Sequence, residues 1–253
     1  MKTAVISGGA GGLGRALSAA LQSEGWQVVL IDLGISTLKA TDTQIPMQCD
    51  LTDAEHLAAT MAQITARFPR IDLAIYNAGI TQIGAFDATD DASHRKVFEI
   101  NYFAAVAMAR HLLAPVRAAQ GAHLAISSVA GFSPLYHRTA YAASKHALEG
   151  FFKSLRSEEK EHGVHTLIAA PSFVATNIGN DQRQDDGTAR PGSATDGMDY
   201  MTPEDAAAEI LQGLRKARPM IPVGRIARAA WWVNSLSPRL FQRLMERQID
   251  GQR

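Results

Sequence analysis

The sequence predicts an α/β fold, a doubly wound parallel β-sheet with helices on both faces, followed by a C-terminal helical tail. Short apolar segments rich in β-branched residues alternate with longer amphipathic segments six times over, and turn residues separate them at short spacing. This alternation is typical of strand–helix–strand units, which make the strands parallel and cover both faces of the sheet. The predicted strands cover residues 3–6, 27–31, 47–49, 71–76, 123–127, 164–169 and 220–223.

Composition narrows the class of protein. A chain of 253 residues, 46% of them hydrophobic, is long enough for one large α/β domain with a substantial core. The zero formal net charge gives no indication of a nucleic-acid partner. The single cysteine, Cys49, excludes an internal disulfide and is typical of a reducing compartment. Residues 1–8 are too short for a secretion signal, and no stretch reaches the ~20 apolar residues that span a bilayer, so we expect a cytoplasmic protein.

The first strand leads into a glycine-rich turn, Ser7-Gly8-Gly9-Ala10-Gly11-Gly12-Leu13-Gly14, and then into a helix. Glycines let the backbone approach a pyrophosphate closely, and the N-terminus of the helix supplies N–H donors and the positive end of its dipole. A turn in this position is the dinucleotide-binding fingerprint of a Rossmann-like domain. The alternative interpretation is a plain tight turn.

The second strand ends on Asp32, at the ~20-residue distance where dinucleotide-binding domains carry an acidic residue. A carboxylate there accepts hydrogen bonds from both adenosine ribose hydroxyls but repels a 2′-phosphate. Repulsion of ~2 kcal/mol, half the Coulomb energy at ~4 Å and an effective dielectric constant of about 20, gives about thirtyfold discrimination. We therefore expect NAD rather than NADP, because Arg15 falls inside the first helical turn and no basic residue follows Asp32. The alternative is that Asp32 caps a helix.

Two further turns follow predicted strands at the same edge of the sheet. Asp50 follows the third strand and either contacts the adenine amino group or starts the turn, while Thr52 or Asp53 caps the next helix. The fourth strand ends in Asn77-Ala78-Gly79, small residues that leave room for a cofactor.

A long helix is predicted over residues 91–119, and Pro115 is expected to bend or end it. Asn101 lies in its middle, although asparagine has poor helix propensity and needs hydrogen-bond partners when buried. It either holds a water or forms a bend, or it is an ordinary polar surface position.

Tyr141 and Lys145 lie one turn apart in a helix predicted over residues 139–160. Positions i and i+4 project from the same face of a helix, so the phenol and the ammonium are neighbours. Bringing a tyrosine from its usual pKa of about 10 to near 7 takes roughly 4 kcal/mol of phenolate stabilisation, which a nearby cation can supply. The pair is a candidate acid–base pair; the alternative is a half-buried aromatic beside a solvated lysine.

With these motifs in order, the chain resembles the short-chain dehydrogenase/reductase (SDR) family over residues 3–176. The resemblance implies an oxidoreductase that transfers a hydride between a nicotinamide cofactor and a secondary alcohol or ketone. Tyr141 would be the general acid and base, and Ser128, thirteen residues earlier, would orient the substrate carbonyl in preference to Ser127. Lys145 would lower the pKa of Tyr141 and hold the nicotinamide ribose, and Asn101 would anchor a water in a proton relay. The cofactor-binding candidates are Ser7, Gly8, Gly12, Leu13, Gly14, Asp32, Asp50, Leu51, Asn77, Ala78, Gly79, Tyr141, Lys145, Pro171, Val174 and Thr176.

Three positions depart from the family pattern without removing a reacting group. Ser7 replaces a common threonine and keeps the hydroxyl, Ser172 replaces the usual glycine after Pro171, and Tyr76 replaces the first of two asparagines. No metal site is expected, because the histidines form no ligand motif.

We interpret residues 1–224 as one catalytic domain whose polar segment 177–201 is a long mobile loop over the substrate, and residues 225–253 as a helical extension of that domain.

A tail helix starts at Ser237-Pro238, with an apolar stripe that includes Leu240 and Leu244. The tail has six arginines against two carboxylates, a net charge of +4. Such a segment lies on a membrane surface or caps a pocket for a lipid-like substrate; packing on the domain or on a partner subunit is the interpretation we favour.

Alternatives to the oxidoreductase are a non-catalytic NAD(H)-binding regulator or scaffold, and a peripheral membrane dehydrogenase of a lipid-like alcohol. The resemblance also implies a homo-dimer or homo-tetramer, paired through the helices that carry Asn101 and Tyr141.

Overall fold

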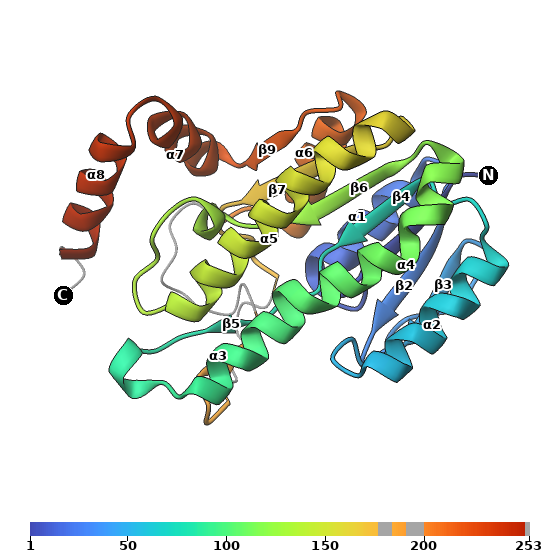
Figure 1. Cartoon of the computed structure of the whole chain (residues 1–253), viewed down its shortest axis with the longest axis horizontal. Helices are drawn as coiled ribbons and strands as arrows, with labels where there is room; N and C mark the ends of the chain where they lie inside the picture. The colour runs from blue at the N-terminus through green and yellow to red at the C-terminus, as the bar shows by residue number, and fades with distance from the viewer. Residues whose placement is uncertain (177–183, 191–199, 251–253) are drawn as a thin grey trace.

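The computed structural model describes residues 1–176, 184–190 and 200–250 (Figure 1). Seven parallel strands form the central sheet, in the order β3-β2-β1-β4-β6-β7-β9. The predicted fold class, a doubly wound parallel sheet, is confirmed. The strands are β1 (Thr3–Ser7), β2 (Gln27–Asp32), β3 (Gln44–Gln48), β4 (Leu73–Tyr76), β6 (Ala122–Ile126), β7 (His165–Pro171) and β9 (Met220–Val223).

Helices cover both faces of this sheet (Figure 1). One face carries α1 and α6, and the other carries α2, α4 and α5. The helices are α1 (Gly12–Ser23), α2 (Ala54–Arg67), α3 (Asp91–Phe98), α4 (Ala104–Ala119), α5 (Thr139–Glu159), α6 (Pro203–Arg215), α7 (Arg225–Leu236) and α8 (Pro238–Asp250). Three short 3₁₀ turns are η1 (Phe86–Ala88), η3 (Val129–Gly131) and η4 (Lys160–His162).

The core consists of two apolar layers, one on each side of the sheet. Along β1, Ile6 faces the layer under α1 and α6, and its neighbour Val5 faces the layer under α2, α4 and α5. Successive side chains of a strand point to opposite faces, so a strand covered on both sides must be apolar at every position. This explains why all five residues of β1 are buried.

The long helix predicted over residues 91–119 is interrupted. A π-helical turn, η2 (Glu99–Phe103), lies between α3 and α4 and contains Asn101. Pro115 does not end the helix, because it lies inside α4, where its carbonyl accepts a hydrogen bond from the Ile71 N–H (3.0 Å). No helix follows β2 in the described connection to β3, so the interpretation of Asp32 as a helix cap is wrong.

Part of the loop predicted over residues 177–201 carries a short strand. Residues 177–183 and 191–199 lie outside the described residues. Within the described part, β8 (Thr188–Ala189) pairs antiparallel with β5 (Thr81–Gln82), which follows the Asn77-Ala78-Gly79 turn. This pairing joins the loop to the edge of the site.

The tail forms two helices, as predicted. The first, α7, packs on β9 and near η3, and α8 packs on α7. Figure 1 shows α8 at the end of the molecule, away from the sheet. Among the described helices, none is both long enough and apolar enough to cross a bilayer.

A buried histidine links two central strands. The Tyr76 hydroxyl on β4 forms a hydrogen bond with Nδ1 of His123 on β6 (2.6 Å), and both residues are inaccessible or nearly so. This hydrogen bond links strands β4 and β6 at the position where the family resemblance implies an asparagine. The pKa of His123 is lowered to about 4, mainly by burial; Glu159 raises the pKa and Arg117 lowers it by smaller amounts.

We predict that stability falls on acidification because of His123. Between about pH 6.5 and about pH 4 the unfolded chain binds a proton that the folded chain does not, so unfolding becomes easier as the pH falls. From about pH 7.5 to about pH 5 this group should remove about 2 kcal/mol from the free energy of unfolding. Urea unfolding at both pH values measures it. His123→Gln should lose this pH dependence and exposed His111→Gln should keep it; equal behaviour of the two variants would contradict the assignment.

Candidate active site

A cavity of about 1120 Å³ runs along the carboxyl ends of the central strands. One end is formed by the glycine-rich turn and the ends of β2 and β3, and the other by η3, the start of α5, the segment after β7 and both tail helices. Tyr141 and Lys145 line the middle. The volume exceeds the ~300–1,000 Å³ usual for one ligand, which suits a dinucleotide and a substrate side by side.

The glycine-rich turn has a conformation that side chains would block. Gly8 has a φ of +66°, and a Cβ on Gly14 would lie 2.3 Å from the Gly8 carbonyl oxygen. A Cβ on Gly12 would lie 3.0 Å from Cβ of Thr176, at the far side of the turn. The helix α1 begins at Gly12, which lines the cavity, so its N–H groups and dipole face the space that a pyrophosphate would occupy. This end therefore fits a dinucleotide.

Ser7 and Asn77 join the glycine-rich turn to the end of β4. The Ser7 hydroxyl accepts hydrogen bonds from the N–H groups of Asn77 and Ala78, both at 3.1 Å. In return, Nδ2 of Asn77 donates to the carbonyl oxygens of Ser7 (3.1 Å) and Gly8 (3.0 Å). Ser7 and Gly14 shape the turn without lining the cavity, whereas the other predicted cofactor-binding residues line it.

Asp32 and Arg15 lie together beside the glycine-rich turn, at the end of the cavity that we call the adenosine end because the sequence predicts the adenosine there. The Asp32 carboxylate accepts hydrogen bonds from the N–H groups of Ala10 (2.9 Å) and Gly34 (3.3 Å). The Arg15 guanidinium donates to the Ala10 carbonyl (2.8 Å) and to the Thr37 hydroxyl. We expected Arg15 to lie away from the site because it falls inside the first helical turn. This expectation is wrong, because both side chains line the cavity.

Asp50 starts the turn, which is one of the two roles that its sequence position allowed, and its contact with the adenine amino group stays a prediction. Its Oδ1 accepts hydrogen bonds from the N–H (2.9 Å) and the hydroxyl (2.7 Å) of Thr52, which start the turn and lower the pKa of the carboxyl group. Asp50 and Leu51 also line the cavity. The helix that follows is capped by Asp53, whose carboxylate accepts two N–H groups of its first turn.

Tyr141 is 9% exposed and lines the cavity from the first turn of α5. Burial raises the pKa of its phenol, while a hydrogen bond with Ser128 and the positive charge of Arg138 lower it, and the balance lies above the usual value. Ser128 precedes η3 and also lines the cavity. Ser127 is engaged elsewhere, because its hydroxyl donates to Oε1 of Glu149 (2.9 Å). Of the two serines, only Ser128 contacts Tyr141 within the described residues.

Lys145 is buried beside Tyr141. Its Nζ lies 5.8 Å from the centroid of the Tyr141 ring and donates to the Ile126 carbonyl (2.9 Å) at the end of β6. The pKa of Lys145 is lowered to about 8, because the lowering by burial exceeds the raising by Glu149. Ser128 and Arg138 lower the pKa of Tyr141, and the effect of Lys145 on that pKa stays a prediction.

Asn101 is buried, which excludes the surface interpretation. Its Oδ1 accepts from the Ile80 N–H (2.8 Å), and its Nδ2 donates to the Ile80 carbonyl (2.9 Å) and the Ser144 hydroxyl (2.9 Å). The Ser144 hydroxyl in turn donates to the Tyr141 carbonyl (2.8 Å). Asn101 thus ties the loop after β4 to the helix of Tyr141, and the π-helical turn aims its side chain there; such turns recur at functional sites.

The end of the cavity opposite the glycine-rich turn is formed by segments that lie far apart in the sequence. Residues 133–138, Phe173 and the tail residues Ile226, Ala230 and Met245 line it. The sequence did not predict these residues as part of the site, because they belong to segments that carry no family motif. The only sequence signal was the apolar stripe of the last helix, which includes Met245.

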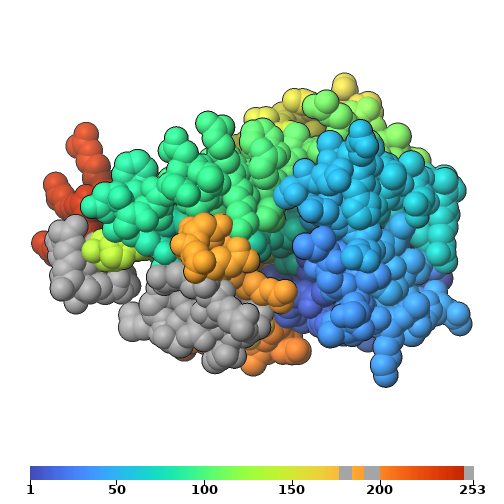
Figure 2. Space-filling view, turned by 90° about the horizontal axis from the view of Figure 1, so that it is seen from below, coloured from blue at the N-terminus to red at the C-terminus, as the bar shows by residue number. Residues whose placement is uncertain are grey.

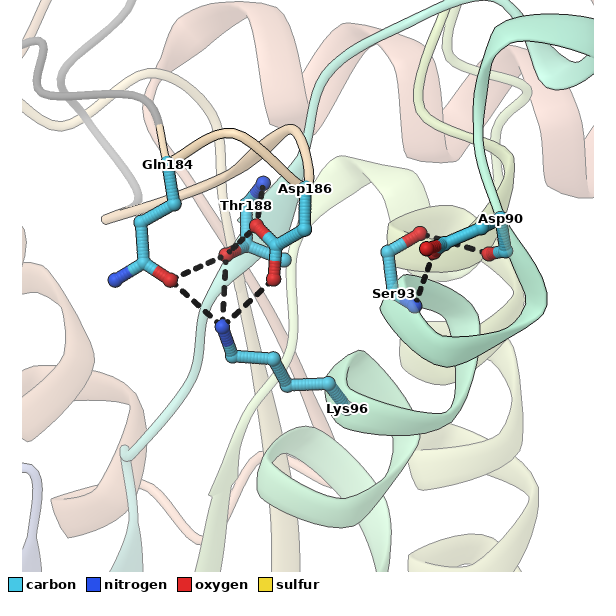
Figure 3. A network of polar contacts seen from close by, with 6 residues as sticks. All are labelled: Asp90, Ser93, Lys96, Gln184, Asp186 and Thr188. Atoms are coloured by element: carbon cyan, nitrogen blue, oxygen red, sulfur yellow. Dashed lines mark hydrogen bonds and ion pairs between the residues drawn. The ribbon is translucent and has the colours of Figure 1, made fainter.

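A set of polar contacts, which we call the clasp, holds the described residues 184–190 to α3 at this end (Figure 3). Lys96 donates to Oε1 of Gln184 (2.7 Å), Oδ2 of Asp186 (2.8 Å) and the Thr188 hydroxyl (3.2 Å). Burial alone would raise the pKa of Asp186, but the hydrogen bonds from Lys96 and Thr188 lower it to about 2. Figure 2 shows this segment in orange against α3 in green. Asp90 caps α3, since its carboxylate accepts the Ser93 N–H (2.7 Å).

Comparison with known proteins decides the family. The sequence matches the family described as "short chain dehydrogenase" over residues 2–187. The Bos taurus protein "Dehydrogenase/reductase SDR family member 7B" is 32% identical over 257 residues, which cover 95% of this chain and 79% of that protein. The chain belongs to the short-chain dehydrogenase family. This short-chain dehydrogenase is therefore an oxidoreductase of the nicotinamide-dependent kind.

Solved structures of other short-chain dehydrogenases share the fold. One from Streptomyces avermitilis has a TM-score of 0.81 at 24% identity and covers 99% of this chain and 98% of its own. Another, from Burkholderia cenocepacia and in complex with NADP, has a TM-score of 0.84 at 21% identity and covers 97% and 99%. Identities this low show the fold alone.

We predict that the Ser127–Glu149 pair of this short-chain dehydrogenase is sensitive to Gly131→Ala. A Cβ at Gly131 would lie 2.2 Å from Oε1 of Glu149 and 2.4 Å from the Ser127 hydroxyl, so it would separate two buried partners. The expected loss of unfolding free energy is about 1–3 kcal/mol. Thermal or urea unfolding measures it. Gly150→Ala is the matched control, because nothing lies within 4 Å of its Cβ and alanine favours a helix by about 0.5–1 kcal/mol. A loss no larger in Gly131→Ala than in the control would refute the clash.

Proposed function

We propose that this short-chain dehydrogenase transfers a hydride between NAD and a secondary alcohol or ketone, with Tyr141 as general acid and base. The observation that carries the proposal is the placement of Tyr141, a buried phenol in the middle of the cavity with Ser128 as its hydrogen-bond partner and Lys145 one helical turn away. A proton donor in this position meets a substrate oxygen between the dinucleotide end and the end lined by residues 133–138 and the tail helices.

Tyr141 and Ser128 have different roles in the proposed reaction. A bound nicotinamide supplies the site that accepts or donates the hydride. Tyr141 takes the proton of the alcohol, or returns it to the carbonyl oxygen, and the Ser128 hydroxyl orients and polarises that oxygen. The Ser128 oxygen already accepts the Ala130 N–H (3.2 Å), which fixes the oxygen and leaves its proton available to donate.

Lys145 and Asn101 support this proton transfer. The pKa of Lys145, about 8, lies near neutral pH, and its ammonium is positioned by the Ile126 carbonyl. We assign Lys145 to the nicotinamide ribose. We assign Asn101 to the relay that connects Lys145 to water, since a Cβ on Gly79 would lie 3.2 Å from Oδ1 of Asn101 and 3.5 Å from Nζ of Lys145. The two polar groups therefore face the same small residue.

The preference for NAD rests on Asp32. Two backbone N–H groups hold its carboxylate at the adenosine end, where it faces the ribose position with negative charge. Arg15 is the opposing feature, because a cation on the same wall favours a phosphate. Its guanidinium donates to the Ala10 carbonyl and the Thr37 hydroxyl, and the neighbouring Asp32 carboxylate offsets its positive charge. The predicted homo-oligomer and the cytoplasmic location stay predictions.

We predict that Tyr141→Phe abolishes most turnover while retaining the cofactor. The variant removes only the hydroxyl that exchanges the proton, so kcat should fall by about 10²–10⁴-fold. The assay follows NADH absorbance with a panel of secondary alcohols and ketones, and fluorescence titration reports NADH binding. Tyr102→Phe, which removes a phenol hydroxyl outside the cavity, should retain both. Turnover by Tyr141→Phe at the wild-type rate would remove Tyr141 from the mechanism, and a cellular function that survives this substitution would favour a regulator.

We also predict that Asp32→Ala reverses the cofactor preference. The wild type should bind NADH about thirtyfold more tightly than NADPH, because the carboxylate repels a 2′-phosphate. Without it, Arg15 is the charged group that remains at this end, so NADPH binding should improve, and Asp32→Ala/Arg15→Ala should lose that gain. Parallel titrations of both nucleotides measure the ratio, with Asp87→Ala as the control for an exposed carboxylate. Wild-type binding of NADPH as tight as that of NADH would show that Asp32 does not select.

A further inference from the structure

The outer surface of the tail presents large apolar side chains to solvent. Leu236, at the corner between α7 and α8, is 79% exposed, and Leu240 and Leu244 of α8 are 49% and 46% exposed. Trp232 of α7 is 59% exposed. Leu240 and Leu244 are one turn apart, so they form a row along α8, which we call the leucine row.

Arginines accompany this row. Arg239, Arg243 and Arg247 are exposed and follow one another at single-turn spacing. At about 100° per residue, each arginine lies on the helix surface next to the leucine row. No ion pair involves these three arginines among the described residues. The outer face of α8 is therefore apolar and positively charged at once.

The inner face of the same helix is already used. Phe241 is 5% exposed, and Met245 lines the cavity. The leucine row consequently cannot turn inward without removing Phe241 from its packing. An outside partner must cover the row if anything does, and that partner would lie beside the end of the cavity where Met245 is.

We propose that the outer face of α8, with the α7–α8 corner, binds the surface of an anionic phospholipid bilayer. A helix with leucines next to arginines places its apolar side chains at the level of the acyl chains and its cations at the phosphates. The exposed Trp232 suits the same boundary, because tryptophan favours the interface between lipid and water. The helices of the tail are too short and too polar to cross the bilayer, so the association is peripheral.

A second copy of the chain fits this face less well. Two-fold pairing is isologous, so α8 would pack on α8 of the other copy. Each copy would then bring its own row of Arg239, Arg243 and Arg247 into one interface, with Glu246 as the only carboxylate on the described side chains of the helix. Anionic lipid supplies the opposite charge that a second copy lacks.

Co-sedimentation of the full chain with vesicles tests the proposal. The wild type should bind phosphatidylcholine vesicles that contain phosphatidylglycerol and should bind pure phosphatidylcholine vesicles at least tenfold more weakly. Leu240→Ser/Leu244→Ser, which changes only exposed side chains, should weaken binding by about tenfold or more. Arg239→Gln/Arg243→Gln/Arg247→Gln should weaken it by about fivefold for each arginine.

Matched control variants test whether binding depends on this face or only on the total positive charge and exposed apolar area of the protein. Lys39→Gln/Arg70→Gln/Arg110→Gln removes three exposed cations elsewhere, and Phe86→Ser removes a 69% exposed apolar side chain elsewhere. Both should bind like the wild type. Absence of binding to the anionic vesicles, or an equal loss in the controls, would overturn the proposal. So would light scattering that shows an oligomer dissociating in Leu240→Ser/Leu244→Ser, because the face would then belong to a second copy.

Discussion

A buried ammonium group is the constraint on which the catalytic end of this short-chain dehydrogenase depends. Lys145 is 4% exposed, and a charge in such a place needs fixed partners. The fold supplies the Ile126 carbonyl from β6 and the charge of Glu149 one turn further along α5. Glu149 is itself buried and satisfied by Ser127 and by Lys153 (2.7 Å). The strand end, the serine loop and the helix of Tyr141 are therefore stabilised by one set of contacts.

The π-helical turn extends this set to the loop after β4. An asparagine inside a regular helix would cost helix stability, but Asn101 satisfies both hydrogen-bonding groups of Ile80 and reaches Ser144 on α5. Gly79 passes close to Asn101 and Lys145 because it has no side chain. The glycine is thus needed for a close approach, and the polar groups of three separate segments meet around it.

The two ends of the cavity are built on different principles. The dinucleotide end uses backbone N–H groups and short side chains of turns that directly follow β1, β2 and β4, so local sequence specifies most of it. The other end collects residues from η3, residues 133–138, the end of β7, Lys96 and the two tail helices, which are far apart in the chain. The dinucleotide end suits a cofactor that many enzymes share, and the other end suits a substrate specific to this protein. The tail lines that other end through Ile226, Ala230 and Met245, and it carries the leucine row on its outer face.

The sequence by itself determined the parallel sheet, the range of the helix that carries Tyr141 and nearly all residues of the dinucleotide end, because hydrophobic period and turn chemistry are local properties. It also identified Tyr141 and Lys145 as neighbours through helical spacing. Only the tertiary structure decided that Arg15 reaches the adenosine end and that α8 directs its leucines outward. These outcomes depend on which distant segments pack together, and packing of distant segments leaves no periodic pattern in the chain.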